Sequence, residues 1–308
     1  MKLYLAPMEG LTGYVYRNAH RECFGEMDGY FTPFLASKKL SSKEKREVHP
    51  ENNFNMKVIP QILTNRTGEF LAIAKQLEDR GYESVNLNLG CPSGTVTAKN
   101  RGAGFLKVTD ELEAFLETIF RECPIKISVK TRIGAYNPEE FSDLIKIYNR
   151  FPMEELIVHP RLMKDFYEGT PNLAAFSEAV EECVHPLCYN GDINSRADYE
   201  RITSMFPSVD RIMLGRGLLA NPAIPRILQG GDGATIEEMK VFHELLYKGY
   251  REEIPEERNV LFKLKALWVF MGGFFTDNEA AMKDIRKSQS YMEYEIAVRN
   301  MMKCCIKS

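Results

Sequence analysis

Short apolar runs alternate with longer amphipathic segments over the first three quarters of the chain. The short runs, such as Ile125–Lys130, are rich in apolar and β-branched residues, which is typical of buried strands. The longer segments place apolar residues at helical spacing, as Leu112, Phe115 and Ile119 do after Asp110. We expect strands at 2–6, 29–34, 58–63, 84–88, 125–130, 155–159, 187–190 and 210–214, with helices between most of them.

These alternating elements form eight β/α units over about 230 residues, which is the usual size of a (β/α)8 TIM barrel. A doubly wound open sheet is the competing α/β architecture. The number of strands favours the barrel, and so does the absence of an early G-x-G-x-x-G motif. We therefore predict an α/β protein built on a TIM barrel.

A glycine-rich segment, Gly230–Gly233, interrupts this alternation and reads as a linker. Beyond it the sequence contains no convincing strand, and helices are expected at 236–250, 260–270, 279–287 and 291–305. The prediction is a barrel domain over 1–231, followed by a small C-terminal all-helical domain over 232–308.

The composition excludes some classes of protein and leaves others open. Hydrophobic residues make up 44% of the chain, which excludes a disordered protein. The 40 basic and 43 acidic residues give a net charge of −3, which excludes a nucleic-acid binder held by bulk positive charge. A local basic surface remains possible, because residues 38–47 hold five cations and residues 283–308 hold six against three acids.

Cysteine usage and hydropathy point to a reducing, aqueous compartment. The seven cysteines are odd in number and none shows C-x-x-C spacing, so we expect neither a disulfide framework nor a metal site. No apolar run is long enough for a signal peptide or a membrane span. The prediction is a cytoplasmic protein that does not insert into membranes.

Polar residues and glycines follow most of the predicted strands, on the face where barrels carry their active sites. Barrel stability alone does not require them there, so their repetition favours a functional site. The residues at these strand ends are Ala6-Pro7-Met8, Gln61, Asn88, Cys91, Lys130, Arg132, His159, Arg161, Asn190-Gly191-Asp192 and Gly215-Arg216-Gly217.

Three of these features indicate particular chemistry. Gly215-Arg216-Gly217 follows the eighth strand, where barrels of this kind often bind phosphate, although such a tripeptide is also a common turn. Lys130 ends an apolar strand and could be a fixed cation for an electron-rich cofactor ring, or simply a lysine directed to water. Cys91 lies on a long loop, and its thiol, with an ordinary pKa of about 8.5, could act as an acid or a nucleophile.

Taken in order, these motifs resemble the tRNA-dihydrouridine synthases. The segments that carry the resemblance are Ala6-Pro7-Met8, Asn88-Leu89-Gly90-Cys91-Pro92, Gly102-Ala103-Gly104 with Leu106, Val129–Arg132, Val158-His159 with Arg161, Asn190-Gly191-Asp192 and Gly215-Arg216-Gly217. The chain departs from many relatives at Pro160 and Leu162. In the loop after Cys91, Lys99 and Arg101 are the only cations.

The resemblance implies an FMN enzyme that reduces the C5–C6 double bond of specific uridines in tRNA, with NADPH as the reductant. Hydride would pass from flavin N5 to C6, and Cys91 would give a proton to C5. FMN would be bound by Ala6, Pro7, Met8, Gln61, Lys130, His159, Asn190, Gly191, Asp192, Gly215 and Arg216. The substrate would be bound by Asn88, Arg161, Lys99 and Arg101. The family implies no metal and no obligate protein partner.

Two other functions are compatible with parts of this pattern. One is an FMN-dependent barrel that reduces a small-molecule pyrimidine or an enone, which would have no need of a helical tail. The other is a non-catalytic tRNA-binding or chaperone protein, which would have no need of the set formed by Asn88, Cys91, Lys130, His159 and Arg216.

Overall fold

The apolar runs of the sequence form nine strands, all paired in parallel into a single sheet in the computed structural model, which describes residues 1–306. The strands are β1 (Lys2–Leu5), β2 (Gly29–Phe31), β3 (Val58–Ile59), β4 (Gln61–Ile62), β5 (Ser84–Leu89), β6 (Lys126–Arg132), β7 (Leu156–His159), β8 (Leu187–Tyr189) and β9 (Arg211–Leu214). Their order in the sheet is β3-β2-β1-β9-β8-β7-β6-β5-β4. The two edge strands of this sheet, β3 and β4, are consecutive in the chain, so the sheet curls round into a barrel. The predicted TIM-barrel fold is confirmed.

Pro60 divides the predicted third strand into β3 and β4. A proline has no backbone N–H to donate, so the ladder is interrupted there. On the far side of the break, the Leu35 N–H donates to the Gln61 carbonyl at 2.7 Å, and the Leu63 N–H donates to the Leu35 carbonyl at 2.9 Å. The interruption therefore helps to close the barrel, since β3 pairs with β2 while β4 pairs with β5 and Leu35.

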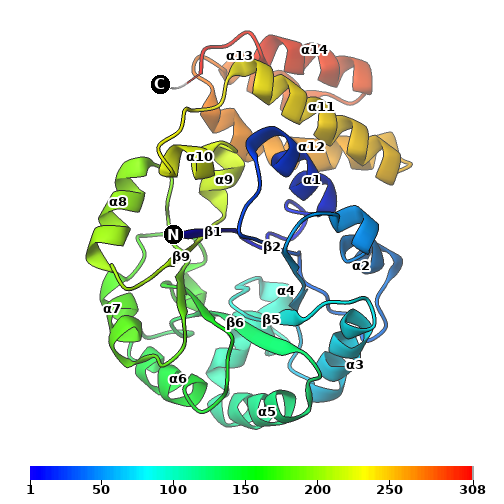
Figure 1. Ribbon diagram of the computed structural model, residues 1–308. Coiled ribbons are helices and arrows are strands. Elements are labelled where there is room, and N and C mark those ends of the chain that lie inside the picture. Colours follow the sequence, from blue (N-terminus) through cyan, green and yellow to red (C-terminus); the bar gives the residue numbers. More distant parts are fainter. Residues whose placement is uncertain (307–308) are drawn as a thin grey trace. The chain divides into compact units, whose positions relative to one another are not determined.

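Helices surround this sheet because each buries one apolar face against it (Figure 1). On α5, the apolar face predicted from the sequence is buried. The Phe115 ring packs edge-on against the rings of Phe70 and Phe105, with ring centres 6.0 and 5.3 Å apart. The surrounding helices are α3 (Thr67–Glu78), α5 (Thr109–Glu122), α6 (Glu140–Tyr148), α7 (Leu173–Glu182) and α8 (Arg196–Met205).

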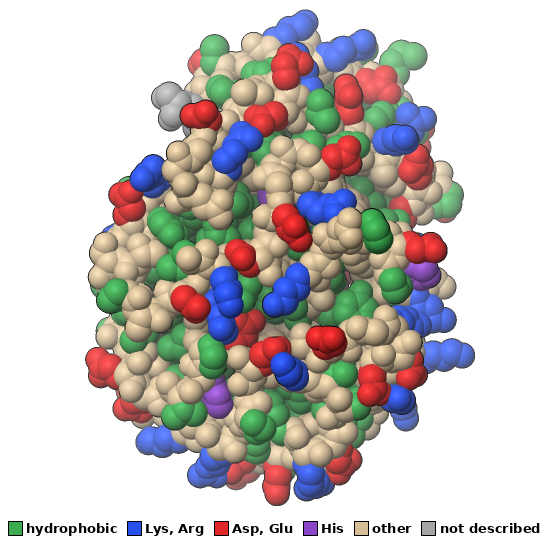
Figure 2. All heavy atoms as spheres, in the orientation of Figure 1, with side chains coloured by type: hydrophobic (Ala, Val, Ile, Leu, Met, Phe, Trp, Pro, Cys, Tyr) green, Lys and Arg blue, Asp and Glu red, His purple; other side chains and the backbone are tan. Residues whose placement is uncertain are grey.

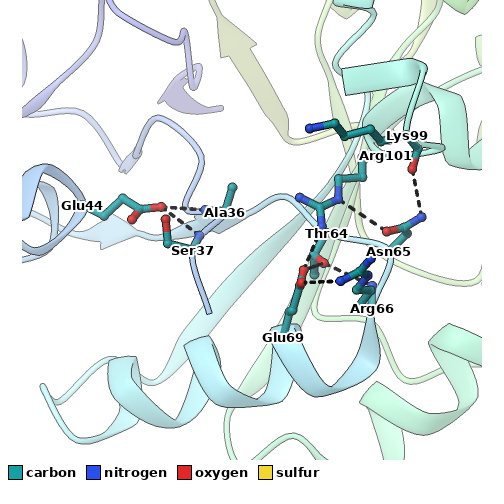
Figure 3. Close-up of polar contacts among 9 residues, drawn as sticks. All are labelled: Ala36, Ser37, Glu44, Thr64, Asn65, Arg66, Glu69, Lys99 and Arg101. Atoms are coloured by element: carbon teal, nitrogen blue, oxygen red, sulfur yellow. Dashed lines mark hydrogen bonds and ion pairs between the residues drawn. The ribbon is translucent and has the colours of Figure 1, made fainter. Parts of the chain in front are cut away.

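Several predicted loops contain short helices. They are α2 (Ser42–Glu47), η1 (Pro50–Asn53), α4 (Gly94–Thr97), η2 (Gly102–Lys107) and η3 (Met163–Asp165). Helix α2 lies in the basic segment 38–47 and begins with a capping box between Ser41 and Glu44. The Glu44 carboxylate also accepts the N–H groups of Ala36 and Ser37 at 2.7 and 3.1 Å (Figure 3), so it fixes the loop that precedes the helix.

Contact density divides the chain into two units. The first comprises Met1–Pro7, Asp28–Asp192 and Glu200–Leu214, and the second comprises Met8–Met27, Ile193–Tyr199 and the chain from Gly215 onward. The second unit therefore takes in α1 as well as the helices on both sides of the glycine-rich segment. The domain boundary expected at residue 231 stays a prediction.

The second unit is helical, and its interior is aromatic. Its helices are α1 (Tyr14–Phe24), α9 (Arg216–Ala220), α10 (Ile224–Leu228), α11 (Ile236–Glu253), α12 (Glu257–Met271), η4 (Gly272–Phe274), α13 (Glu279–Lys287) and α14 (Tyr291–Met301). The buried Trp268 Nε1–H donates to the Tyr294 hydroxyl at 2.8 Å, and that hydroxyl lies 2.8 Å from His243 Nε2. Phe242 of α11 packs edge-on against Tyr16 of α1 at 5.6 Å.

The surface carries both signs of charge. Figure 2 shows acidic and basic side chains interspersed over the face drawn. The five cations expected in the basic segment are all solvent-accessible. Two of them precede α2 and three lie on it: Lys38 and Lys39, then Lys43, Lys45 and Arg46. Within residues 1–306, no helix is both long and apolar enough to span a bilayer.

Candidate active site

Strands β5, β6 and β7 place three of the predicted site residues at their carboxyl ends. Asn88 pairs with Lys130 in the β5–β6 register, and Arg132 pairs with His159 in the β6–β7 register. Side chains on one strand alternate between faces, so Lys130 and Arg132 share a face of β6. The register therefore brings an amide, two cations and an imidazole to neighbouring positions.

Lys130 has no hydrogen-bond or ion-pair partner among the residues that the structure describes. Burial and, to a lesser extent, the nearby Arg132 cation together lower the pKa of its ammonium group to about 8. A partly desolvated cation without an anionic partner is costly in free energy. A ligand with electron-rich oxygen or nitrogen atoms would offset that cost.

Asn88 fixes the turn that carries Cys91. The Asn88 Oδ1 atom accepts the backbone N–H groups of Gly90 and Cys91, both at 3.0 Å. Its Nδ2 donates to Gln61 Oε1 at 2.7 Å, which leaves one N–H of the amide available to a substrate. The structure thus gives Asn88 a positioning role for Cys91 in addition to the predicted substrate contact, which stays a prediction.

The same polar chain continues through the barrel interior. Gln61 Nε2 donates to Asn86 Oδ1 at 2.8 Å, and Asn86 Nδ2 donates to Ser128 Oγ at 2.9 Å. All three side chains are buried. Because each amide is held by its neighbour, the orientation of Gln61 is fixed, and one N–H and one lone pair remain for a cofactor.

Arg132 is a functional candidate to which the sequence analysis gave no role. Its fully buried guanidinium donates from Nε to the Gly90 carbonyl at 2.9 Å and from Nη1 to the Leu162 carbonyl at 2.7 Å. Its Nη2 is buried and has no hydrogen-bond partner among residues 1–306. The two-residue spacing from Lys130 was the signal in the sequence, since it places both cations on one face.

An aromatic pair completes this side of the site. The Arg132 guanidinium carbon lies 5.3 Å from the ring centre of Tyr167, and that ring stacks on the His159 imidazole at 6.1 Å. Tyr167 is half exposed and was not predicted. It follows the short helix η3, so no periodic pattern pointed to it.

Arg161 is saturated by contacts within the protein. Its Nη1 donates to His159 Nε2 at 3.1 Å and to Asp192 Oδ1 at 3.2 Å, and its Nη2 donates to Asp192 Oδ2 at 2.5 Å and to the Gly169 carbonyl at 2.6 Å. Its Nε donates to the Glu168 carbonyl at 3.0 Å. These contacts use all five N–H groups, so the predicted substrate contact would require one of them to break.

The bond from Arg161 also sets the protonation of His159. A guanidinium only donates hydrogen bonds, so His159 Nε2 accepts and the ring proton lies on Nδ1. In this tautomer the ring of His159 carries its N–H donor at Nδ1. Its role as a flavin ligand stays a prediction.

The predicted cofactor residues of the first unit also have structural roles. Ala6 belongs to the apolar core of the barrel together with Phe31 and Met213, and Pro7 follows it directly. Asn190 Nδ2 donates to the Met213 carbonyl at 2.8 Å. A Cβ on Gly191 would overlap the Tyr189 hydroxyl, so packing alone requires glycine there.

Three predicted cofactor residues belong to the second unit. The Met8 N–H donates to Thr12 Oγ1 at 2.8 Å, and the Gly215 carbonyl accepts the N–H of Leu218 at 3.0 Å. Arg216 is the first residue of α9. Their role in binding a cofactor stays a prediction.

Of the two loop cations, Arg101 is paired, whereas the Lys99 ammonium has no ion-pair partner among the residues described. Arg101 Nη2 lies 3.0 Å from Glu69 Oε2, whereas Figure 3 shows the Lys99 side chain directed away from this cluster. Both were predicted to bind substrate. Over residues 1–306 there is also no group of three or more His, Cys, Asp or Glu side chains that could hold a metal.

This arrangement can stabilise an anion and deliver a proton at one place. Lys130 and Arg132 supply positive charge, and the pKa values of both respond to the Cys91 thiol, which places that thiol within electrostatic range of the two cations. The Cys91 backbone is held by Asn88. Such a set suits the reduction of a conjugated carbonyl compound, where charge develops on oxygen and a carbon is protonated.

Comparison with known sequences identifies a related family. The family model described as dihydrouridine synthase matches residues 4–252. A Staphylococcus epidermidis protein named "Probable tRNA-dihydrouridine synthase" is 26% identical over 234 residues, covering 71% of this chain and 69% of that protein. The Pasteurella multocida protein named tRNA-dihydrouridine synthase B is 26% identical over 237 residues, covering 74% and 69%.

Solved structures resemble the fold at low sequence identity. An old yellow enzyme homologue from Zymomonas mobilis matches with a TM-score of 0.52 at 11% identity, covering 77% of this chain and 91% of that one. Morphinone reductase matches with a TM-score of 0.51 at 11% identity, covering 78% and 88%. These similarities support the barrel assignment.

Proposed function

This chain belongs to the dihydrouridine synthase family of flavin-dependent oxidoreductases, and we propose that it reduces the C5–C6 double bond of specific uridines in tRNA. We further propose FMN as the flavin and NADPH as the source of electrons. The observation that carries the proposal is the Lys130 ammonium, which has no hydrogen-bond or ion-pair partner within residues 1–306 and lies in register beside Asn88, the residue that holds Cys91.

The residues of the first unit fit a flavin. A reduced isoalloxazine carries negative charge, which Lys130 would hold, and the fixed Gln61 amide has one donor and one acceptor left for the ring. His159 would donate from Nδ1, and Ala6 with Pro7 would offer an apolar surface. Asn190, Gly191, Asp192, Gly215 and Arg216 would bind the ribityl phosphate, and Met8 would contact the ring, as the resemblance implies.

The chain's own residues would supply the acid and the charge stabilisation. When bound, flavin supplies a hydride to C6 of the uracil. Cys91 Sγ–H would give its proton to C5, so the C5–C6 bond gains two hydrogens and the thiolate is reprotonated from water. The second N–H of the Asn88 amide and Arg132 Nη2, neither of which has a hydrogen-bond partner in the described part of the chain, would bind the uracil carbonyl oxygens, where negative charge develops.

A tRNA substrate accounts for the basic segment at α2. Stacked bases in folded RNA are inaccessible, so the target uridine must leave the stack to be reduced. The exposed cations of residues 38–47 and the exposed Lys99 would track RNA phosphates. We also propose a cytoplasmic location, where a tRNA substrate would be available.

Mass spectrometry of tRNA tests the proposal. Cells that lack the gene should lose dihydrouridine at a defined position, and the purified yellow protein with NADPH should restore it to their tRNA. A protein that binds no flavin, or a deletion strain with unchanged dihydrouridine, would rule the function out. Turnover of free pyrimidines without turnover of tRNA would instead favour a small-molecule reductase.

A further inference from the structure

We propose that Arg101 is a positioning residue, which holds the Cys91 loop through an ion pair with Glu69 on α3. The inference rests on the proposed function, since it assigns Arg101 a role in placing the acid Cys91. It replaces the expectation that Arg101 binds RNA directly.

The segment that follows Arg101 lies directly against Cys91. The Ala103 N–H donates to the Cys91 carbonyl at 3.0 Å. Gly102 has a φ of 56°, and a Cβ there would come within 2.8 Å of the Cys91 carbonyl oxygen and 3.0 Å of the Cys91 Cβ. Because Gly102 and Ala103 pack directly against Cys91, a shift of the neighbouring Arg101 backbone would also displace Cys91.

The anchor for this loop is the start of α3 and the turn before it (Figure 3). Arg101 Nη2 lies 3.0 Å from Glu69 Oε2, and Thr64 Oγ1 donates to the same carboxylate at 2.5 Å. Asn65 bridges the two segments, since its Nδ2 donates to the Lys99 carbonyl at 3.1 Å and its Oδ1 accepts from Arg101 Nε at 3.4 Å. Glu69 and Asn65 thus hold the loop at the Arg101 side chain and at the Lys99 carbonyl, while Thr64 orients the Glu69 carboxylate.

The burial of the pair separates it from ordinary surface ion pairs. The side chains of Arg101 and Glu69 are 20% and 17% exposed, whereas Arg66, which also contacts Glu69, is 73% exposed. Water and salt screen such a shielded pair less than an exposed one. Glu69 neutralises the Arg101 guanidinium, which would therefore attract phosphate only weakly. Lys99, on the same loop, would make that contact instead.

Glu69→Gln distinguishes the two roles because they predict opposite effects on tRNA. If Arg101 bound phosphate, removing the competing carboxylate would strengthen tRNA binding, and Arg101→Gln would weaken it. In the positioning role, both variants lower kcat by about 10- to 100-fold while tRNA affinity stays within about twofold of wild type. We therefore expect the two variants to behave alike in FMN-loaded enzyme.

A second readout needs neither tRNA nor turnover. Peptide mass spectrometry can follow the rate at which iodoacetamide alkylates Cys91 in the FMN-loaded protein. We expect this rate to change severalfold in both variants and to return toward wild type in Arg101→Lys. This measurement keeps its meaning if the substrate is not tRNA, so failure of the inference and failure of the proposed function are distinguishable.

Arg66→Gln is the matched control, because Arg66 pairs with the same Glu69 at 3.4 Å without touching the Cys91 loop. It should leave kcat and the alkylation rate unchanged. Circular dichroism should show that the Glu69 and Arg101 variants fold like wild type. Wild-type alkylation rates in both variants, or tighter tRNA binding by Glu69→Gln, would overturn the inference.

Discussion

At the scale of single residues, Lys130 and Cys91 set the conditions for the proposed chemistry. Lys130 is held at a strand end where burial lowers its pKa to about 8, so an electron-rich ligand would stabilise its charged form. The backbone of Cys91 is held by the Asn88 side chain, which fixes the position from which its thiol would act. One residue thus contributes charge and the other a proton, and they can be tested separately.

We expect the affinity of the apoprotein for FMN to fall with pH above about 8. Burial lowers the pKa of Lys130 to about 8, so the cation that would hold the flavin is lost as pH rises through that value. The dissociation constant should then increase about tenfold per pH unit. Fluorescence titrations from pH 6.5 to 9.5 check this, and Lys130→Met should bind about 10- to 100-fold more weakly without that pH dependence.

Cys91→Ala should keep FMN and its reduction by NADPH, yet form dihydrouridine about 10²- to 10⁴-fold more slowly. The reason is that hydride donation leaves charge on the uracil that only a proton at C5 can neutralise. Single-turnover assays with reduced enzyme and tRNA measure this step. The exposed Cys305 provides the control, since Cys305→Ala should behave as wild type. Equal rates in both variants would exclude Cys91 as the acid.

At the scale of elements, the start of α11 is stabilised by its own capping box and by Arg226 of α10. Thr235 and Glu238 form a capping box, and the guanidinium of Arg226 binds both Glu238 carboxylate oxygens at 2.7 and 3.1 Å. Arg226 also donates to the carbonyls of Asp232 and Gly233. The segment that reads as a linker is therefore held by hydrogen bonds from Arg226.

Glu238→Ala should lower the free energy of unfolding by roughly 2 kcal/mol, since it removes a cap and a charged hydrogen-bonded pair. The hydrogen bonds from Arg226 lower the pKa of Glu238 to about 2. Because this pKa is lower in the folded state, the ionised carboxylate stabilises the fold at pH values above its ordinary pKa of 4.5. This stabilisation is lost as the pH falls toward 2. Urea denaturation measures the effect. Glu237→Ala, at an exposed neighbouring position paired only with Lys240, should cost much less.

At the scale of the whole molecule, two buried histidines make stability depend on pH. His20 Nε2 lies 3.0 Å from the Pro222 carbonyl, and His243 contacts Tyr294. Burial lowers the pKa of each to about 4, so both are neutral in the folded state at pH 5. Unfolding lets each take up a proton below its ordinary pKa of 6.5, which favours the unfolded state.

Stability should therefore fall as pH drops from 6.5 toward 4, by about 2 kcal/mol per histidine at pH 5. Comparing urea midpoints at pH 7.5 and 5.0 measures the loss. His20→Gln should reduce the difference between the two midpoints, whereas His49→Gln, at an exposed position, should not. A wild-type midpoint that does not move between these values would contradict the assignment of neutral buried histidines.

The sequence by itself determined the barrel, the helical tail and the family, because each depends on local information. The periodic spacing of apolar residues that marks strands and helices is visible over a short stretch of sequence, and the motif around Asn88 and Cys91 is contiguous. Proline at position 60 was equally visible, yet its effect on closure depends on Leu35, which is distant in the chain. Local sequence patterns predict where strands and helices lie, whereas the pairing of strands depends on residues that are distant in the chain.

Only the tertiary structure decided which polar groups are occupied and which remain available. Arg161 and Arg101 are both arginines on loops, but the first is saturated by contacts that include Asp192 and the second is paired with Glu69, 32 residues earlier. Arg132, for which the sequence predicted no role, keeps a buried Nη2 that has no hydrogen-bond partner within residues 1–306. The number of hydrogen bonds a side chain has left is set by its neighbours in space, and spacing along the chain does not encode it.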